Sequence, residues 1–275
     1  MNTLVSTEEL AAHPEWRLFD CRHDLGNPEL GEQQYLAAHL PGARFAHLDR
    51  DLSAPKTGKN GRHPLPEPKA FIAWLGRQGL KPADQVACYD GGPGAMAARL
   101  WWMLRWAGHE TVAVLDGGLA KWLREGRPVA TEIPAVDRAS YPGKARASMV
   151  ASLPLVEKKL KRAALLDARA AVRYRGEQEP IDPVAGRIPG AKNRFNNDNL
   201  SVEGTFKNPK LLRSEFESIL AGRNPGDVIN YCGSGVAACH NALAMEVAGP
   251  TGSRVYIGSW SEWSADASRP IARSV

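Results

Sequence analysis

Short apolar runs alternate with longer segments of helical spacing along the whole chain. The apolar runs are rich in Val, Ile and Leu, and each ends in polar residues or glycine, as at residues 18–22, 86–91, 165–169 and 228–233. Such runs are typical of buried strands, whereas the segments between them repeat apolar residues with the period of a helix. The alternation predicts α/β units built around a mostly parallel sheet.

The same succession of motifs occurs twice. Four motifs of the first half return in the same order in the second half; the pairs are 18–22 with 165–169, 39–43 with 187–191, 86–91 with 228–233, and 114–118 with 256–259. The separation changes little, from 148 residues between Pro41 and Pro189 to 141 residues between Trp122 and Trp263. A nearly constant separation of this kind predicts a duplicated domain.

The length of the chain agrees with two domains. A chain of 275 residues exceeds the usual size of one domain. Residues 127–150 contain three prolines, mixed charges and little periodicity, which is typical of a linker. We therefore expect a first domain at 1–135, a linker at 136–150 and a second domain at 151–275.

Two helices are predicted in equivalent places of the two copies, at about residues 95–107 and 236–248. Each is followed by a glycine, Gly108 or Gly249, the residue that best closes a helix in the left-handed conformation. Residues 99–106 are apolar nearly all round, which indicates a core or domain-interface helix. A site for an aromatic ligand is the less favoured interpretation of the same residues.

A long segment at residues 49–68 interrupts the first copy. It is rich in proline, glycine and basic side chains, among them Lys56, Lys59, Arg62 and His63. The composition predicts a loop, and long loops in compact domains often serve a function. The sequence leaves two interpretations open: a solvated surface excursion, or a segment that covers the other domain.

Composition excludes several classes of protein. Hydrophobic residues make up 43% and charged residues 24%, which are ordinary globular values. The 35 basic residues exceed the 30 acidic ones by only 5, without a Lys/Arg block, so we expect mild attraction of small anions and no nucleic-acid partner. No apolar run approaches the roughly 18 residues of a membrane helix, and residues 1–18 lack the pattern of a signal peptide.

The four cysteines do not form a recognisable framework. They contain no C-x-x-C pair, so neither a disulfide scaffold nor a zinc site is predicted. A reducing cytoplasm is the expected compartment, because a free thiol stays reactive there. The sequence leaves the oligomeric state open, and a monomer is compatible with it.

One cysteine occupies a loop suited to chemistry. A β-branched run stops at Cys232, glycines follow at 233 and 235, and a small-residue helix begins directly afterwards. Backbone N–H groups of such a loop can converge on the sulfur, and the helix N-terminus adds partial positive charge. Both favour the thiolate, which is the reactive form of cysteine. The alternative is a small buried residue in an ordinary turn.

The equivalent loop of the first copy carries Asp90 where the second copy has Cys232. A carboxylate cannot hold a transferable sulfur atom. We therefore expect the first copy to be catalytically inactive and to support or cover the site.

With these motifs, the chain resembles the two-domain rhodaneses, a family of sulfurtransferases, over nearly its whole length. The supporting motifs are His-Leu-Pro-Gly-Ala at 39–43, Arg-Ile-Pro-Gly-Ala at 187–191, Asp-Gly-Gly-Leu-Ala-Lys-Trp at 116–122, Cys-Gly-Ser-Gly-Val at 232–236 and Gly-Ser-Trp-Ser-Glu-Trp at 258–263. The resemblance implies tandem rhodanese domains, each a doubly wound, mostly parallel, five-stranded sheet flanked by helices. It also implies that only the second domain carries the working cysteine.

The resemblance implies a two-step transfer of sulfur. The Cys232 thiolate attacks the outer sulfur of an anionic donor and becomes a persulfide, and a thiophilic acceptor such as cyanide, a thiol or a reductant then removes that sulfur. Neither a metal nor an organic cofactor is needed. The loop amides would stabilise both anions, and the loop residues assigned to the catalytic site with Cys232 are Gly233, Ser234, Gly235, Val236, Ala237 and Ala238.

The loop resembles that of the 3-mercaptopyruvate sulfurtransferases. Thiosulfate enzymes of the animal type carry arginine and lysine directly after the cysteine, where this chain has Gly233 and Ser234. Ser234 is expected to bridge a proton or a carbonyl through a hydrogen bond; the alternative is a serine that bonds only the backbone. Ala237 stands where threonine is common, so one loop hydroxyl is missing.

A carboxylate donor needs an arginine from another segment. Arg173 matches the family position that binds the donor, and its guanidinium suits two-point binding of a carboxylate. The mercaptopyruvate enzymes place a second arginine about nine residues on, but residues 179–183 contain none. Arg187 or Arg194 could substitute for it. This departure keeps thiosulfate open as the donor.

His39 matches a first-domain histidine that the mercaptopyruvate enzymes keep near the site, so we assign it with Arg173 and Arg187 to substrate binding. A structural histidine at a strand turn is the alternative.

Two other functions use a cysteine loop of similar shape. Cysteine-dependent phosphatases need Cys-x5-Arg, but the sixth residue after Cys232 is Ala238, which makes that function a poor fit. A non-catalytic module that carries a persulfide from a partner protein is the other alternative, because its loop would have the same sequence features.

Overall fold

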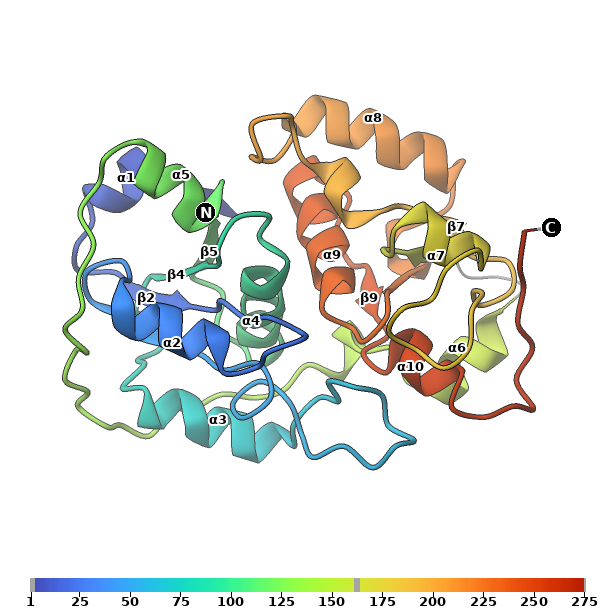
Figure 1. Cartoon of the computed structure of the whole chain (residues 1–275), viewed down its shortest axis with the longest axis horizontal. Helices are drawn as coiled ribbons and strands as arrows, with labels where there is room; N and C mark the ends of the chain where they lie inside the picture. Colours follow the sequence, from blue (N-terminus) through green and yellow to red (C-terminus); the bar gives the residue numbers. More distant parts are fainter. Residues whose placement is uncertain (1–2, 161–163, 275) are drawn as a thin grey trace. The chain divides into compact units, whose positions relative to one another are not determined.

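The computed structural model describes residues 3–160 and 164–274, which form two compact units (Figure 1). Unit 1 comprises Met1–Ala54, Pro66–Arg146 and Val202–Thr205, and unit 2 comprises Pro55–Leu65, Ala147–Ser201 and Phe206–Val275. Part of the predicted loop at 49–68 therefore belongs to unit 2, although unit 1 precedes and follows it in sequence.

Unit 1 contains a five-stranded sheet in which all pairings are parallel. Its strands are β1 (Leu4–Val5), β2 (Arg17–Asp20), β3 (Ala43–Phe45), β4 (Val86–Tyr89) and β5 (Val112–Leu115), in the order β1-β5-β4-β2-β3. The helices that flank it are α1 (Thr7–Ala11), α2 (Leu30–Ala37), α3 (Pro68–Arg77), α4 (Ala95–Trp106) and α5 (Gly118–Arg124). The predicted α/β architecture is confirmed.

Unit 2 repeats this arrangement with a parallel sheet of four strands. They are β6 (Ala164–Asp167), β7 (Lys192–Asn193), β8 (Val228–Tyr231) and β9 (Arg254–Val255), in the order β7-β6-β8-β9. The α-helices are α6 (Leu153–Lys159), α7 (Ala171–Arg175), α8 (Pro209–Leu220), α9 (Ala237–Ala248) and α10 (Ser259–Trp263). Three 3-10 helices complete it: η1 (Ala147–Met149), η2 (Asn196–Asn199) and η3 (Pro225–Asp227).

The second sheet differs from the expected five strands at its edge. In unit 1, β1 pairs with β5 over two residues, Leu4 with Val114 and Val5 with Leu115. At the equivalent edge of unit 2, a single parallel bridge joins Val150 to Val255. The fifth strand is reduced to this bridge, because one pair of residues is too short to form a ladder.

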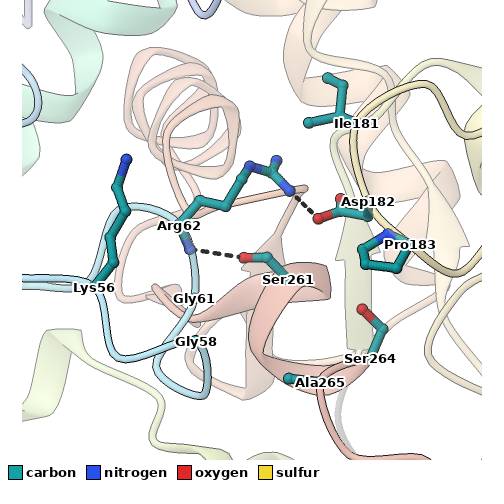
Figure 2. A pocket seen from close by; sticks show the side chains of 10 residues that line it. All are labelled: Lys56, Gly58, Gly61, Arg62, Ile181, Asp182, Pro183, Ser261, Ser264 and Ala265. Atoms are coloured by element: carbon teal, nitrogen blue, oxygen red, sulfur yellow. Dashed lines mark hydrogen bonds and ion pairs between the residues drawn. The ribbon is translucent and has the colours of Figure 1, made fainter.

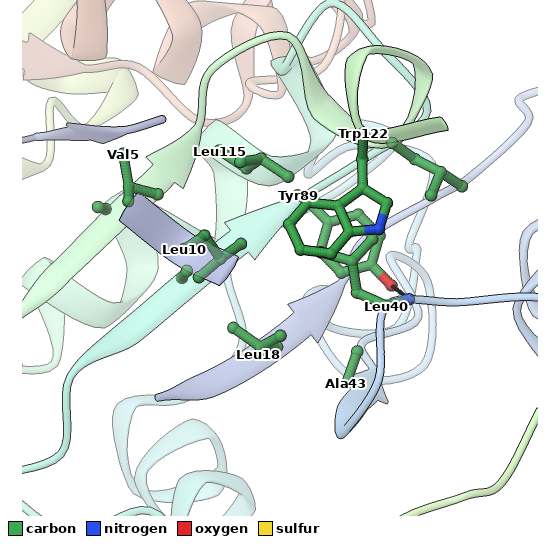
Figure 3. Close-up of a cluster of buried hydrophobic side chains, with 11 residues drawn as sticks. Val5, Leu10, Leu18, Leu40, Ala43, Tyr89, Leu115 and Trp122 are labelled. Atoms are coloured by element: carbon green, nitrogen blue, oxygen red, sulfur yellow. Dashed lines mark hydrogen bonds between the residues drawn. The ribbon is translucent and has the colours of Figure 1, made fainter. Parts of the chain in front are cut away.

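The two copies also share the contacts that hold their cores. The buried hydroxyl of Tyr89 accepts a hydrogen bond of 3.1 Å from the backbone N–H of Leu40, inside the apolar cluster of unit 1 (Figure 3). In unit 2 the hydroxyl of Tyr231 accepts the N–H of Ile188 at 3.3 Å. Burial raises the pKa of both tyrosines well above the ordinary value, so both hydroxyls stay neutral.

The two predicted helices form with the predicted ends. Gly108 and Gly249 follow α4 and α9 with φ of +94° and +102°, the left-handed conformation that favours glycine. Residues 99–106 lie in α4, which packs on β4 and β5, and Trp101 and Trp102 are almost fully buried. These contacts support a core helix rather than an aromatic ligand site.

No helix within residues 3–160 and 164–274 combines the length and the hydrophobicity of a membrane span.

Candidate active site

The cysteine loop of unit 2 connects the end of β8 with the start of α9. Cys232 is the first residue after the strand, and its side chain is buried, with 3% of the residue exposed. Its sulfur accepts hydrogen bonds from the backbone N–H of Gly235 at 3.1 Å and of Ser234 at 3.4 Å. Two N–H groups and the N-terminus of a twelve-residue helix therefore favour negative charge at this atom.

The two glycines of the loop serve different purposes. Gly235 has φ of +80°, and a methyl group added there would lie 2.3 Å from the carbonyl oxygen of Ile257. A methyl group at Gly233 would instead lie 2.7 Å from Nη2 of Arg62 and 3.5 Å from Nη2 of Arg173. Gly235 is thus required by the backbone, whereas Gly233 leaves room for two guanidinium groups.

Helix α10 holds the loop in place. The hydroxyl of Ser259 accepts the N–H of Cys232 at 3.1 Å and donates to the carbonyl of Tyr256 at 2.7 Å. The N–H groups of Trp260 and Ser261 donate to the carbonyls of Cys232 and Gly233 at 3.0 and 2.9 Å. Ser259 itself has φ of +54°, a costly conformation for a residue other than glycine, which these contacts maintain.

A histidine reaches the loop from the segment at 55–65. Nδ1 of His63 lies 2.8 Å from the hydroxyl oxygen of Ser234, and both residues are buried. Ser234 therefore bonds a side chain that can accept or donate a proton, two residues from Cys232. The sequence named His63 only as part of a basic loop, and neither its spacing nor its neighbours pointed to Ser234.

Arginines and carboxylates surround Gly233. Arg173, in α7, binds Glu179 (Nη2 to Oε1, 2.6 Å) and Asp182 (Nη2 to Oδ2, 3.1 Å). Arg62 forms an ion pair with the other oxygen of Asp182 (Figure 2). Burial lowers the pKa of Arg62, and the charge of Cys232 opposes this change. The sequence predicted Arg173 as a site residue. It did not predict Arg62, because its partner Asp182 lies 120 residues away and no local pattern connects the two.

A second ion pair supports this cluster from the end of β6. Arg169 binds Asp167 (Nη2 to Oδ2, 2.7 Å) and also Glu179 (Nη1 to Oε2, 3.2 Å), and its guanidinium lies over the ring of Trp260. Glu179 therefore joins Arg169 to Arg173. The three arginines of the cluster are matched by three carboxylates; the members are Arg62, Arg169, Arg173, Asp167, Glu179 and Asp182.

A pocket of about 510 Å³ adjoins the cluster. It is lined by residues from 56–62, 181–183 and 261–265, and both Arg62 and Asp182 contribute to its wall (Figure 2). Because Arg62 also lies against Gly233, the pocket approaches the Cys232 loop at this guanidinium.

The other two arginines considered for the donor have different partners. Arg187 donates to the carbonyl of Tyr174 and the hydroxyl of Ser274, and its guanidinium covers the ring of Tyr174. Arg194 donates to Asn199 and pairs with Glu215. None of these contacts links either arginine to the Cys232 loop, so the structure adds no support to their expected role.

His39 is buried in unit 1. Its ring stacks on Tyr35, with Nδ1 at 2.6 Å from the carbonyl oxygen of Tyr35 and Nε2 at 3.1 Å from that of Glu132. Its role in substrate binding stays a prediction.

The first copy fills the equivalent loop with a carboxylate. One oxygen of Asp90 accepts the N–H groups of Gly92 and Gly94 at 2.9 and 3.0 Å. The other accepts those of Met96 and Ala97 at 3.0 and 3.2 Å. The loop between β4 and α4 thus directs four backbone N–H groups at one side chain, an arrangement that suits a group carrying negative charge.

A cluster in unit 1 has the residue types of a metal site. The ligand atoms of His23, His47 and Asp49 lie within 4.8 Å of one another. Nδ1 of His47, however, accepts the backbone N–H of Asp49 at 3.1 Å and of Arg50 at 3.3 Å. The proton of a neutral ring is therefore on Nε2, which presents a donor rather than a lone pair to a metal.

Known proteins are similar in sequence to this chain over nearly its whole length. The Rhodanese-like domain family matches residues 5–125 and 152–266. A probable 3-mercaptopyruvate sulfurtransferase of Pseudomonas aeruginosa is 45% identical over 276 residues, covering 98% of this chain and 97% of the relative. Thiosulfate sulfurtransferase of Bos taurus is 34% identical over 276 residues, covering 94% and 91%.

A solved structure shares the architecture. The 3-mercaptopyruvate sulfurtransferase from Leishmania major superimposes with a TM-score of 0.86 at 30% identity, over 96% of this chain and 74% of that one.

The two loop glycines should respond differently to alanine. We expect Gly235→Ala to lower the free energy of unfolding by at least about 1–3 kcal/mol, because it combines a left-handed φ with a backbone clash. Gly233→Ala should change it by less than about 1 kcal/mol, since only the end of the flexible Arg62 side chain must move. Urea unfolding monitored by tryptophan fluorescence measures both; equal effects would contradict this account of the loop.

Asp90→Ala should destabilise unit 1, because it leaves buried N–H groups without an acceptor. The expected loss is at least about 1–3 kcal/mol, the range for one unpaired buried group. Asp24→Ala is the matched control, because this exposed carboxylate accepts the N–H groups of Gly26 and Asn27 but has water as an alternative. Thermal unfolding of both variants tests the difference, and a similar melting temperature for the two would contradict it.

Proposed function

We propose that this chain, which belongs to the rhodanese family of sulfurtransferases, transfers sulfur from an anionic donor to a thiophilic acceptor through a persulfide on Cys232. 3-Mercaptopyruvate is the favoured donor. The observation that carries the proposal is the pair of N–H groups aimed at the sulfur of Cys232, between β8 and α9. A nucleophilic thiolate needs such donors at a site that is nearly closed to water.

In the first step the Cys232 thiolate attacks the sulfur of 3-mercaptopyruvate. A bond forms between the two sulfur atoms, and the carbon–sulfur bond breaks with its electron pair moving to carbon. The proton of the donor's thiol ends on that carbon, so the products are pyruvate and a persulfide anion on Cys232. The contact between Ser234 and His63 supports a role for this pair in moving the proton.

In the second step an acceptor attacks the outer sulfur of the persulfide. With cyanide, a carbon–sulfur bond forms, the sulfur–sulfur bond breaks, and thiocyanate leaves while the Cys232 thiolate is restored. A thiol or another reductant can take the same sulfur atom. The N–H groups of Ser234 and Gly235, which stabilise the thiolate, are also near enough to stabilise the persulfide.

The preference for 3-mercaptopyruvate rests on the charges near Cys232. The two residues after it, Gly233 and Ser234, bring no cation into the loop. Arg173 offers its planar guanidinium beside Gly233, and this shape suits a carboxylate. Thiosulfate is the second candidate, since the bovine relative of this chain is named a thiosulfate sulfurtransferase.

A reducing cytoplasm remains the proposed compartment. Each of the four cysteines is a buried thiol outside a disulfide, and the reaction requires Cys232 in its thiol form.

Cys232→Ser should abolish the formation of thiocyanate from both donors, because a serine hydroxyl cannot carry the transferred sulfur. Cys239→Ser is the matched control: its hydroxyl can donate to the carbonyl of Gly235 as the thiol does, and activity should persist. Mass spectrometry after donor treatment should find one added sulfur atom on the Cys232 peptide of the unmodified protein. Activity retained by folded Cys232→Ser would refute the mechanism.

The donor is tested by steady-state kinetics with cyanide as the acceptor. We expect kcat/KM to be at least about tenfold higher for 3-mercaptopyruvate than for thiosulfate, equivalent to about 1.4 kcal/mol of transition-state stabilisation. Equal values, or a preference for thiosulfate, would overturn the donor assignment while leaving sulfur transfer itself intact.

A further inference from the structure

We propose that Arg62 is the second arginine that binds the donor's carboxylate, beside Arg173. This inference rests on the proposed function and extends it to specificity. The segment that follows Arg173, residues 179–183, has no arginine of its own. Arg62 comes from a distant segment and reaches that place by binding Asp182, which lies within it.

The backbone of Arg62 is fixed against the same elements that hold the cysteine loop. Its N–H donates to the hydroxyl of Ser261 at 3.0 Å, and the N–H of Ser261 donates to the carbonyl of Gly233. Gly61 has φ of +83°, and a methyl group there would lie 2.8 Å from the carbonyl oxygen of Gly258. The segment at 55–65 can therefore lie this close to α10 only with glycine at position 61.

The side chain of Arg62 is directed by Asp182. Nη1 of Arg62 binds one carboxylate oxygen of Asp182 (Figure 2). Nη2 of Arg173 binds the other oxygen at 3.1 Å. One carboxylate thus positions two guanidinium groups. Both then lie over Gly233, with Nη2 of Arg62 at 2.7 Å and Nη1 of Arg173 at 3.6 Å from the place of a methyl group on that residue.

Each guanidinium keeps donors for an incoming anion. Within the described part of the chain, the side-chain bond of Arg62 uses Nη1, and those of Arg173 use Nε and Nη2. Three nitrogens lie at Gly233, adjacent to Cys232: Nη2 of Arg62 and both Nη atoms of Arg173. Of these, Nη2 of Arg62 and Nη1 of Arg173 are not used in the bonds to Glu179 and Asp182. Two guanidinium groups beside the nucleophile can bind both oxygens of a carboxylate.

The cluster carries no net charge, so directed N–H groups rather than excess positive charge must bind the anion. Its three arginines are balanced by three carboxylates, so a bound anion gains most from N–H groups directed toward it. Burial lowers the pKa of Arg62, whereas the charge of Cys232 raises it. The pocket lined by Arg62 and Asp182 adjoins the ion pair between these two residues.

The kinetic test compares Arg62→Gln with Lys59→Gln. Lys59 lies in the same segment and is exposed, so its variant removes the same charge without touching Gly233. We expect Arg62→Gln to raise KM for 3-mercaptopyruvate by about tenfold or more, with kcat changed only a few-fold, and Lys59→Gln to resemble the unmodified protein. Equal KM values for the two variants would overturn the proposal.

Arg62→Lys keeps the charge and loses the planar fork, so its KM should lie between those of Arg62→Gln and the unmodified protein. It also provides a usable variant if Arg62→Gln fails to fold. If folded Arg62→Lys has a KM as high as that of Arg62→Gln, the charge alone contributes nothing and the planar fork is required, which also supports two-point binding. An unchanged KM would show that only charge at this place matters and would overturn that mode of binding.

A second experiment separates this inference from the proposed function. Cys232 is alkylated with iodoacetate, which carries a carboxylate, and with neutral iodoacetamide of nearly the same size, and the Cys232 peptide is followed by mass spectrometry. Arg62→Gln should lower the ratio of the iodoacetate rate to the iodoacetamide rate by about fivefold or more. A purely structural role would change both rates together and leave the ratio unaltered.

The two experiments test different proposals: the kinetics test the donor, and the alkylation ratio tests the role of Arg62. If the unmodified protein does not use 3-mercaptopyruvate, the donor assignment fails, whereas the alkylation ratio still reports whether Arg62 attracts a carboxylate at Cys232. If the ratio is insensitive to Arg62→Gln, the role of Arg62 fails even when 3-mercaptopyruvate is a good substrate.

Discussion

The convergence of backbone N–H groups at the end of a central strand is the constraint on which both halves of this protein depend. A buried atom that carries negative charge must be paired with donors, because burial without them is costly. Unit 1 meets this condition with the carboxylate of Asp90, which accepts four N–H groups. Unit 2 offers two N–H groups to the sulfur of Cys232. The same loop therefore holds a carboxylate in one copy, and in the other it holds the thiol that we propose as the nucleophile.

The loops are held by an element that follows much later in each copy. Gly118 and Ser259 occupy equivalent places with nearly the same φ, +56° and +54°. Directly after them, the N–H of Leu119 binds the carbonyl of Asp90, and the N–H of Trp260 binds that of Cys232. These contacts orient the donors before any substrate arrives, which is the condition under which dipoles stabilise a developing charge most effectively.

The cationic part of the site is assembled from separate segments of unit 2. Asp182 connects Arg62 with Arg173, and Glu179 connects Arg173 with Arg169, so the guanidinium groups are oriented by carboxylates. Gly233 leaves the space that they occupy. In the proposed reaction the donor would meet its nucleophile and its charge-pairing groups on hydrogen-bonded supports, which reduces the entropic cost of orienting it.

The sequence by itself determined the duplication, the α/β units, the glycine ends of α4 and α9, and the contrast between Cys232 and Asp90. These features depend on neighbours within a few residues and on repetition, both of which are visible in a linear pattern. Only the tertiary structure decided that the fifth strand of unit 2 is a single bridge, and that His63 meets Ser234 and Arg62 meets Asp182. Those last pairs are 171 and 120 residues apart. Their contacts depend on how the segment at 55–65 packs against loops that are distant in sequence, and the local spacing of residues does not encode such packing.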